Sequence, residues 1–590
     1  MTHQINSEPQ QELLCKKGPS WSNGNDFARI DHSKPKFKQI YELFIQFCEN
    51  TSLRGVPRIV HASDRRKRLL WSNFVFLFFI GCIACLILIT KQYLQYDVIH
   101  QPKTIFDAPR AFPSLTICNL RPFKSSDVDR LISRGAVPVE TYFGAILNVA
   151  RHLDKNYASQ FTNLLSLESY LLNLPEGMDP NDLGHHLEQL VRTCTVLYQN
   201  GTSTRGTNCD RAGRWIKTMY RIYHNCYTFE LDDRFKTSTI SIEMVLYLDN
   251  IVEHTSCFDC QCLHVDRIRG SQLTGARLLL NPASSYPRII EEGINLMPGT
   301  LTDIHFTVHE WSMMTPPYGR CSHEAPGEIC FAGQNYTYTE KACHQDVLQE
   351  MCAEQCGCLL YDMPVPCHLI NASLPYCQYF ELPVVNISSR EGQEIRRKYF
   401  SEEAVKSFVN RMNCSSTITR NTLTTETGCQ VPCTRYTYET QISTAQWPTK
   451  QFITNFATMQ LKKNAKKNQT RNTHKLNGGS EIEIFEETRF EELLQPYTEI
   501  YRMTSNGGEP EAVERLMSLQ NVEQNFLSII ISRPAFDIIR TEEKAVVTLT
   551  SLFSQIGGLL SIWVGITMIC IVEVAEFILN CFDVLCARKS

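Results

Sequence analysis

Small and hydroxylated side chains recur along one face of an apolar segment near the end of the chain. They are spaced three or four residues apart, so they share one side of a helix. The five positions are Thr550, Ser554, Gly558, Ser561 and Gly565. Lipid does not solvate hydroxyl groups, whereas a water-filled path does, and small residues also favour a tight seam between helices. This stripe alone fits both hypotheses equally well.

Gly565, Ile566 and Thr567 favour the water-filled path. They lie near the middle of the membrane in this interpretation, and a glycine beside a polar residue allows a short non-helical segment. Non-helical backbone is tolerated at that depth only where it lines a cavity or is covered by protein. Rings of backbone carbonyls and hydroxyls from several subunits can then replace the hydration shell of a cation.

Two apolar segments must position these residues. Residues 69–89 are 21 residues without a charge, enough for a helix to cross a bilayer core of about 30 Å. Residues 545–572 are 28 residues without a charge. Basic side chains precede the first segment at 65–68 and follow the second at 588–589, so the positive-inside tendency predicts that both chain ends are cytoplasmic.

The 455 residues between these segments, 90–544, are then extracellular. Of the 25 cysteines, 18 lie there, as expected of a chain that folds in an oxidising compartment. The same stretch carries glycosylation sequons at Asn200, Asn335, Asn371, Asn386, Asn413 and Asn468. We predict a multi-pass plasma-membrane protein of the membrane α+β class, in which two transmembrane helices flank a large, disulfide-rich, mixed α/β ectodomain.

Hydrophobic periodicity and charge set the boundaries of the predicted regions. An apolar-periodic stretch at 37–47 predicts a short helix under the membrane. Runs of β-branched residues at 239–247 and 526–532 predict strands, the latter being the last strand before the second transmembrane segment. The predicted regions are a cytoplasmic N-terminus at 1–64, a transmembrane helix at 65–92, an ectodomain at 93–544, a second transmembrane helix at 545–582 and a cytoplasmic tail at 583–590.

The composition excludes several classes of protein. Lys and Arg total 58 and Asp and Glu total 62, and the resulting net charge of −4 argues against a nucleic-acid partner. The zinc-protease, serine-hydrolase and phosphate-loop sequence motifs do not occur, so we expect neither an enzyme nor a cofactor. The cysteines at 257, 260 and 262 have the spacing of a metal site, but disulfides are favoured in an oxidising ectodomain, and we expect no metal.

Several motifs, in order along the chain, resemble those of the degenerin/epithelial sodium channel family. The longest is Ser554-Gln-Ile-Gly-Gly-Leu-Leu-Ser-Ile-Trp-Val-Gly-Ile-Thr567 in the second apolar segment. The others are Phe112–Asn119, Asn225–Phe229, Gly293–Gly299, Gly428–Tyr436 and Trp447-Pro448. The resemblance covers residues 37 to 580, and the whole chain looks most like the invertebrate channels gated by FMRFamide and related RFamide neuropeptides.

The resemblance implies a homotrimer in membrane lipid that conducts Na⁺ and is blocked by amiloride. Its ectodomain would be shaped like a hand, with a palm and a β-ball. The remaining parts would be a finger at about 119–226, a thumb at about 315–440 and a knuckle at about 449–525.

The resemblance also implies roles for individual pore residues. Gly565, Ile566 and Thr567 would form the selectivity filter, where the family commonly has serine at the last position. Ser561 and Gly558 would bind the blocker, and Ser554 would lie at the gate. Arg54-Gly55 matches the cytoplasmic gating motif, which is usually His-Gly.

Disulfide pairings follow from the same resemblance. It implies the pairs Cys118–Cys226, Cys194–Cys209, Cys321–Cys433, Cys343–Cys429, Cys356–Cys377 and Cys358–Cys367. Among the remaining cysteines we expect Cys352–Cys414. Cys257, Cys260, Cys262 and Cys330 are left without an assigned pairing.

Two stretches bear on the stimulus that opens the channel. Acid-sensing members carry a His-His pair just outside the first transmembrane segment, and residues 93–98 have none, which argues against proton gating.

A ligand that ends in Arg-Phe-amide needs a carboxylate beside an apolar slot. The finger offers Tyr142, Phe143, Asp154 and Glu168, with ordinary helix surface as the competing interpretation. We expect gating by an extracellular peptide; a constitutive or proton-gated sodium channel of the same family is the alternative.

Two other classes of membrane protein fit less well. A purinergic receptor shares the two spans and the trimeric assembly, but it needs a lysine-rich nucleotide cradle that we do not find. An adhesion receptor without a pore leaves the hydroxyl stripe unexplained.

Overall fold

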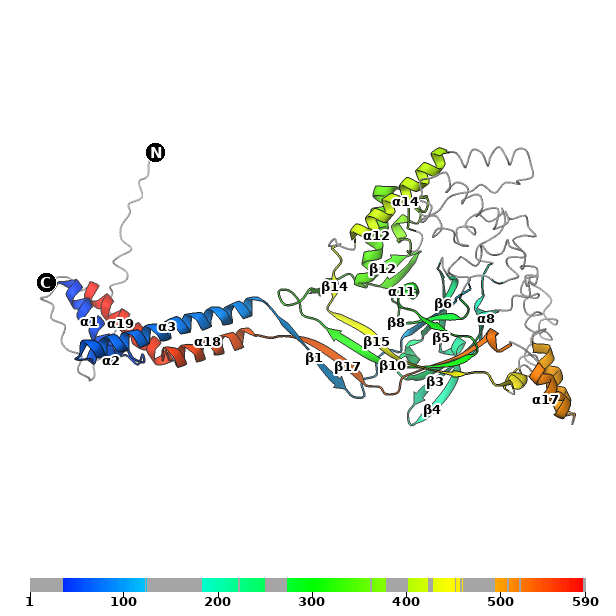
Figure 1. Cartoon of the computed structure of the whole chain (residues 1–590), viewed down its shortest axis with the longest axis horizontal. Coiled ribbons are helices and arrows are strands. Elements are labelled where there is room, and N and C mark those ends of the chain that lie inside the picture. Colours follow the sequence, from blue (N-terminus) through cyan, green and yellow to red (C-terminus); the bar gives the residue numbers. More distant parts are fainter. Residues whose placement is uncertain are drawn as a thin grey trace, which may run out of the picture. The chain divides into compact units, whose positions relative to one another are not determined.

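The computed structural model describes residues 35–121, 124, 183–220, 223–249, 273–360, 363–377, 402–422, 428–450, 452–456, 459, 494–506, 509–518 and 522–586. Contacts within the chain define two compact units, residues 1–100 with 543–590, and residues 101–542. Figure 1 labels the elements of both units. The predicted residues outside the described ranges are Tyr142, Phe143, Asp154, Glu168, Cys257, Cys260, Cys262, Asn386 and Asn468.

A long apolar helix, α3 (Arg65–Leu94), contains the whole first apolar segment. It begins where the carboxylate of Asp64 accepts the N–H of Arg66 at 3.2 Å, a side-chain cap that satisfies one of the unpaired N–H groups of the first turn. Within the described part of the chain it is the one unbroken helix that is long and apolar enough to cross a membrane.

The second apolar segment is not one continuous helix. It forms α18 (Leu549–Trp563) and α19 (Met568–Cys586), which are bent by 77° at a break over residues 564–567. Together the two helices are long and apolar enough for one broken span. The sequence predicted one helix over 545–582 that admits a short non-helical piece, and the structure divides it at that piece.

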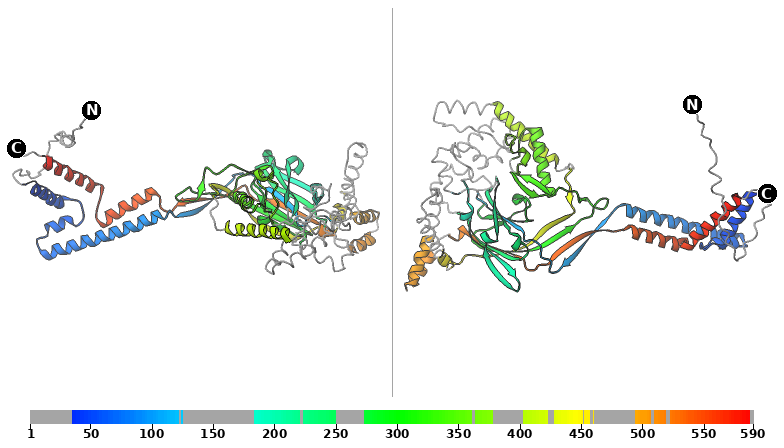
Figure 2. Two further views of the ribbon diagram at one scale, coloured as in Figure 1. Left: turned by 90° about the horizontal axis from the view of Figure 1, so that it is seen from above. Right: turned by 180° about the vertical axis from the view of Figure 1, so that it is seen from behind.

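α3 and α18 lie side by side in Figures 1 and 2. Their contact is close because Gly81 has no side chain: a Cβ atom there would lie 2.6 Å from the ring of Trp563. Phe78, one turn away on α3, meets the same ring edge to face with centroids 6.0 Å apart. The seam between these helices therefore depends on Trp563 and Gly81.

A second helix pair lies at the other end of this unit. α1 (Lys36–Asn50), which contains the predicted helix at 37–47, lies beside α19 and is followed by α2 (Val56–His61). Phe47 contacts Phe577 with ring centroids 5.0 Å apart. The Lys36 ammonium donates to the Leu585 carbonyl at 2.7 Å, so the pairing extends along the length of α1.

The larger sheet has eight strands. Seven of them follow the order β1 (Val98–Ile105), β17 (Ile538–Ala545), β10 (Thr300–Ser312), β16 (Phe526–Ser532), β7 (Thr239–Tyr247), β3 (Val191–Asn200) and β4 (Ser203–Asn208). The eighth strand, β15 (Thr434–Gln446), also pairs with β10. β10 runs parallel to β16 and β17 and antiparallel to β15. The predicted strands at 239–247 and 526–532 are present as β7 and β16. β17 was not predicted because its four charged side chains obscure the strand pattern.

A smaller sheet contains the most completely buried strands. Its order is β5 (Gly213–Tyr220), β6 (His224–Leu231), β2 (Ser114–Asn119), β8 (Ala276–Asn281) and β9 (Ile294–Leu296). Every residue of β2 and β6 is buried, so both faces of these strands are covered. Leu115 and Phe229 from this sheet share one apolar core with Ile242, Phe306 and Ile529 from the larger sheet.

The remaining elements of the second unit are mostly helices and short strands. Near the strands are α8 (Leu187–Leu190), α9 (Cys209–Ala212), α10 (Asp233–Lys236), α11 (Ile289–Glu292) and η5 (Val522–Asn525). The cysteine-rich part contains β11 (Cys321–Ser322), β12 (Glu328–Phe331), β13 (Gln334–Thr337), α12 (Glu340–Cys356), η4 (Cys367–Leu369), α14 (Glu402–Thr422) and β14 (Val431–Pro432). α12 and α14 lie beside each other (Figures 1 and 2), and α17 (Glu509–Ser518) follows a helical stretch at 494–505.

Seven disulfides join described cysteines. Four are pairs that the resemblance implied, Cys118–Cys226, Cys194–Cys209, Cys321–Cys433 and Cys343–Cys429. Cys118 on β2 is directly opposite Cys226 on β6 in the strand register, with Cα atoms 4.4 Å apart.

Three of the expected pairings, Cys356–Cys377, Cys358–Cys367 and Cys352–Cys414, are wrong. The structure forms Cys356–Cys414, Cys358–Cys377 and Cys330–Cys367 instead. Cys356 ends α12 and lies 5.8 Å from Cys414 of α14 between Cα atoms, which is an ordinary disulfide separation. Cys352, one turn earlier, is fully buried in an apolar cluster with Leu348.

Backbone geometry explains the other two pairings. Gly357 has a φ of 62° and reverses the chain after α12, so that Leu359 pairs with Tyr376 and Cys358 meets the neighbouring Cys377. Phe331 pairs with Pro366, which brings the neighbours Cys330 and Cys367 together. These turns are tertiary features that cysteine spacing alone does not reveal.

Candidate functional site

The break between α18 and α19 begins with a tight turn. The N–H groups of Val564 and Ile566 both donate to the carbonyl of Leu560, each at 3.1 Å. Gly565 between them has a φ of 76°, a left-handed conformation that glycine adopts far more readily than other residues. The helix therefore ends where the sequence places a glycine.

Arg54 packs against this turn. A Cβ atom built on Gly565 would lie 2.6 Å from Cγ of Arg54 and 3.1 Å from its backbone nitrogen. Gly55 has a φ of 94°, and a Cβ there would lie 2.7 Å from Val75 of α3. The Arg-Gly pair and the glycine turn, two motifs far apart in the sequence, are thus in contact.

Glu573 on α19 holds the loop that carries Arg54. Its Oε2 accepts the Thr51 hydroxyl and the Ser52 N–H, each at 2.9 Å, and its Oε1 accepts the Ser52 hydroxyl. Sequence reasoning did not assign a role to this glutamate. The available signal was its place as the first charge after 28 uncharged residues. These bonds fix the 51–55 loop beside the start of α19.

The polar stripe lies along α18. The Thr548 hydroxyl caps this helix by accepting the Ser551 N–H at 3.2 Å, and the Ser554 hydroxyl donates to the Thr550 carbonyl at 3.0 Å. Ser554 and Gly558 are exposed in the single chain, and a Cβ on Gly558 would have no atom within 4 Å. The seam with α3 contains Trp563, whereas Ser554 and Gly558 remain exposed and Gly565 is buried against Arg54.

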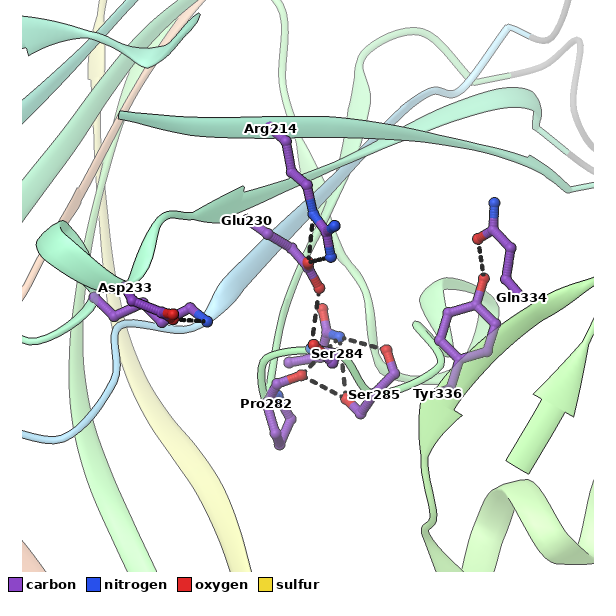
Figure 3. Close-up of polar contacts among 10 residues, drawn as sticks. Arg214, Glu230, Asp233, Pro282, Ser284, Ser285, Gln334 and Tyr336 are labelled. Carbon is purple, nitrogen blue, oxygen red and sulfur yellow. Dashed lines mark hydrogen bonds and ion pairs between the residues drawn. The ribbon is translucent and has the colours of Figure 1, made fainter. Parts of the chain in front are cut away.

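A buried carboxylate joins three segments of the second unit (Figure 3). Glu230 on β6 accepts Arg214 Nη2 at 2.8 Å and the Ser284 N–H at 3.0 Å. The carbonyl of Ser284 in turn accepts the Thr337 N–H of β13 at 2.7 Å. Beside this bond the ring of Tyr286 lies 5.3 Å from that of Tyr336 between centroids. The smaller sheet and the cysteine-rich part are thereby connected.

Another buried carboxylate links β10 to the N-terminal segment at 110 and to β17. Glu310 on β10 accepts Arg110 at 2.8 Å and Arg540 of β17 at 3.0 Å. Its side chain is only 8% exposed, so removing either partner would leave a poorly solvated charge. β17 leads directly into α18 along the chain, so this triad joins the central strand to the strand that precedes the glycine turn.

One buried histidine has a strongly shifted pKa. Burial, followed by the charge of Lys124, lowers the pKa of His185 to about 3. The His185 carbonyl accepts the Tyr227 hydroxyl at 3.0 Å, which holds the residue against β6. A pKa this low favours the neutral imidazole near neutral pH.

Comparison with known proteins agrees with these features. The family described as "Amiloride-sensitive sodium channel" matches residues 47–577. The chain is 22% identical over 577 residues to the "FMRFamide-activated amiloride-sensitive sodium channel" of Cornu aspersum, covering 91% of this chain and 83% of that protein. It is 23% identical over 628 residues to the epithelial sodium channel subunit beta of Xenopus laevis, covering 92% and 83%. The chain therefore belongs to the amiloride-sensitive sodium channel family.

Proposed function

We propose that three copies of this chain form a sodium-selective channel of the plasma membrane that is opened by an extracellular RFamide-type neuropeptide. Both chain ends are cytoplasmic in this proposal, and the second unit is the hand-shaped ectodomain. α3 is the first transmembrane helix, and the broken pair α18–α19 is the second. Family membership supports the sodium conductance and the block by amiloride.

The observation that carries the pore assignment is the helix break at Gly565. Three such turns around one axis would place backbone and hydroxyl oxygens of residues 565–567 close together. Na⁺ is small enough to be held by a compact ring, whereas K⁺ is larger and would lose contacts with it. Residues 565–567 are therefore the proposed selectivity filter.

The polar stripe along α18 supports the remaining pore roles. Ser561 and Gly558 would receive the guanidinium of amiloride as it enters from outside, one or two helical turns before the filter. Ser554, another turn or two before them, is the proposed gate, because small side chains let three helices approach closely and exclude water. The Arg54-Gly55 pair would act on gating through its contact with Gly565.

Peptide gating is supported by the similarity to a relative named for activation by FMRFamide. The absence of a His-His pair at 93–98 weighs against a proton-gated alternative. We propose Tyr142, Phe143, Asp154 and Glu168 as the peptide-binding residues, and Asn200, Asn335, Asn371, Asn386, Asn413 and Asn468 as glycan acceptors.

Expression of this chain alone in an otherwise non-conducting cell tests the proposal. Peptides that end in Arg-Phe-amide should evoke a current that is carried by Na⁺ and blocked by amiloride. The same peptide with a free C-terminal carboxylate is the matched control and should be much weaker. Current that is present without peptide would support the constitutive alternative. Current that appears only on acidification would support the proton-gated alternative. Absence of amiloride-sensitive current at normal surface expression would contradict a homotrimeric channel.

A further inference from the structure

The thiol of Cys570 lies under the glycine turn. Cys570 is the third residue of α19, and only 3% of it is exposed. Its Sγ lies 3.5 Å from the backbone nitrogen of Thr567 and 3.7 Å from the Thr567 hydroxyl. It also lies 3.7 Å from the carbonyl oxygen of Gly565. One side chain therefore contacts both ends of the three-residue segment 565–567.

These contacts use the thiol as an acceptor and as a donor. Sulfur accepts the N–H of Thr567, the residue before the helix, while the Cys570 N–H donates to the Thr567 carbonyl at 3.1 Å. This resembles a capping box, in which the side chain of the third helical residue reaches back to the N–H of the cap residue. The S–H group is then available to donate to Gly565.

The usual residue at that place in a capping box is glutamate or glutamine. A glutamate would add a charge, and either side chain is larger than the buried space that a thiol fills. Thiol hydrogen bonds are weak. However, two of them act on the backbone of the same short turn, and the thiol that makes them is buried.

We propose that Cys570 is a positioning residue for the selectivity filter. It fixes the direction of the Gly565 carbonyl and holds Thr567 at the start of α19, and so sets the ring of oxygens that the permeating ion meets. This inference rests on the proposed function, because it requires that residues 565–567 form the filter. A cysteine that merely fills space would not affect which ion passes.

Reversal potentials with Na⁺ outside and K⁺ inside the cell test this role in the full-length channel. Cys570→Ala removes the thiol contacts with Thr567 and Gly565. We expect the ratio of Na⁺ to K⁺ permeability to fall at least threefold, which is a shift of about 28 mV at 59 mV per tenfold change. Cys570→Ser keeps a donor and an acceptor of similar size, and we expect it to retain the wild-type ratio. Cys581→Ala, a cysteine substitution further along α19, is the matched control and should also retain it.

A reference variant tests the proposed filter separately from the positioning role of Cys570. Thr567→Val changes the filter itself. If its permeability ratio falls while Cys570→Ala matches wild type, the positioning role is overturned and the proposed filter stands. If neither variant changes the ratio, the proposed filter fails and the positioning role fails with it. If Cys570→Ala carries no current, Cys570→Ser decides: a conducting serine variant with the wild-type ratio supports the role, and one with a lowered ratio overturns it.

Discussion

The contact between Gly565 and Arg54 predicts that these two residues are energetically coupled. Gly565→Ala brings two separable costs. The first is the left-handed backbone, which costs a non-glycine residue about 1–2 kcal/mol. The second is steric, because the new Cβ would lie 2.6 Å from Cγ of Arg54, well inside an ordinary carbon–carbon contact of about 3.5–4.0 Å. The two costs together are enough to move the turn.

Shortening Arg54 should remove the closest part of the steric cost and leave the backbone cost unchanged. Arg54→Ala deletes Cγ, while the Arg54 Cβ and backbone nitrogen, each 3.1 Å from the added carbon, remain. We expect Gly565→Ala to lower the Na⁺ to K⁺ permeability ratio by about tenfold, equivalent to about 1.4 kcal/mol. The double variant should recover part of that loss, with a coupling energy of about 0.5–1 kcal/mol.

The assay is a double-mutant cycle on reversal potentials, with surface expression measured for each variant. Gly557→Ala is the matched control, since a Cβ there would have no atom within 4 Å and the residue lies inside α18. It should keep the wild-type ratio. A loss in the double variant equal to that of Gly565→Ala alone would refute the contact, and a wild-type ratio in Gly565→Ala would refute the role of the turn.

Three further predictions concern blocker binding, gating and pH. Ser561→Trp should raise the amiloride concentration for half block at least tenfold while peptide-evoked current persists; equal block would remove Ser561 from the site. Ser554→Cys treated with a charged thiol reagent should show a resting current, since a shift of about 1.4 kcal/mol changes the closed-to-open ratio tenfold; unchanged current despite labelling would exclude Ser554 from the gate. The folded-state pKa of His185 lies below its ordinary 6.5, so stability is lost as pH falls below that value. The wild type should lose about 2 kcal/mol more than His185→Gln between pH 7 and pH 5, measured by unfolding midpoints; identical profiles would contradict the shift.

The helices of the unit formed by residues 1–100 and 543–590 could be predicted largely from local features of the sequence. An uncharged run of 21 residues is rare outside membranes, and α3 contains all of it. The glycine at 565 indicated a non-helical piece, and the helix breaks there because glycine tolerates a positive φ. The sequence did not predict the 77° bend or the contact of the turn with Arg54, a residue more than 500 positions away.

Long-range pairing limited the predictions for the second unit. The buried strands β7 and β16 carry apolar runs, and the sequence predicted both. β17 carries charged side chains, which are paired with charges on neighbouring segments, as Arg540 is with Glu310, so it lacks the apolar pattern of a strand. All three incorrect disulfides involve cysteines whose partners depend on the path of the backbone. Cysteines only a few residues apart, such as Cys352, Cys356 and Cys358, exchange partners when a helix end or a left-handed glycine turns the chain, and spacing does not record that turn.

The central claim is that residues 565–567 select sodium, and one comparison tests it most directly. Thr567→Ser keeps the hydroxyl at this position, whereas Thr567→Val keeps the shape and removes the hydroxyl. Reversal potentials of the amiloride-sensitive current, with Na⁺ outside and K⁺ inside, should be the same for wild type and Thr567→Ser and should fall for Thr567→Val. A Thr567→Val channel that conducts with the wild-type reversal potential would contradict the claim.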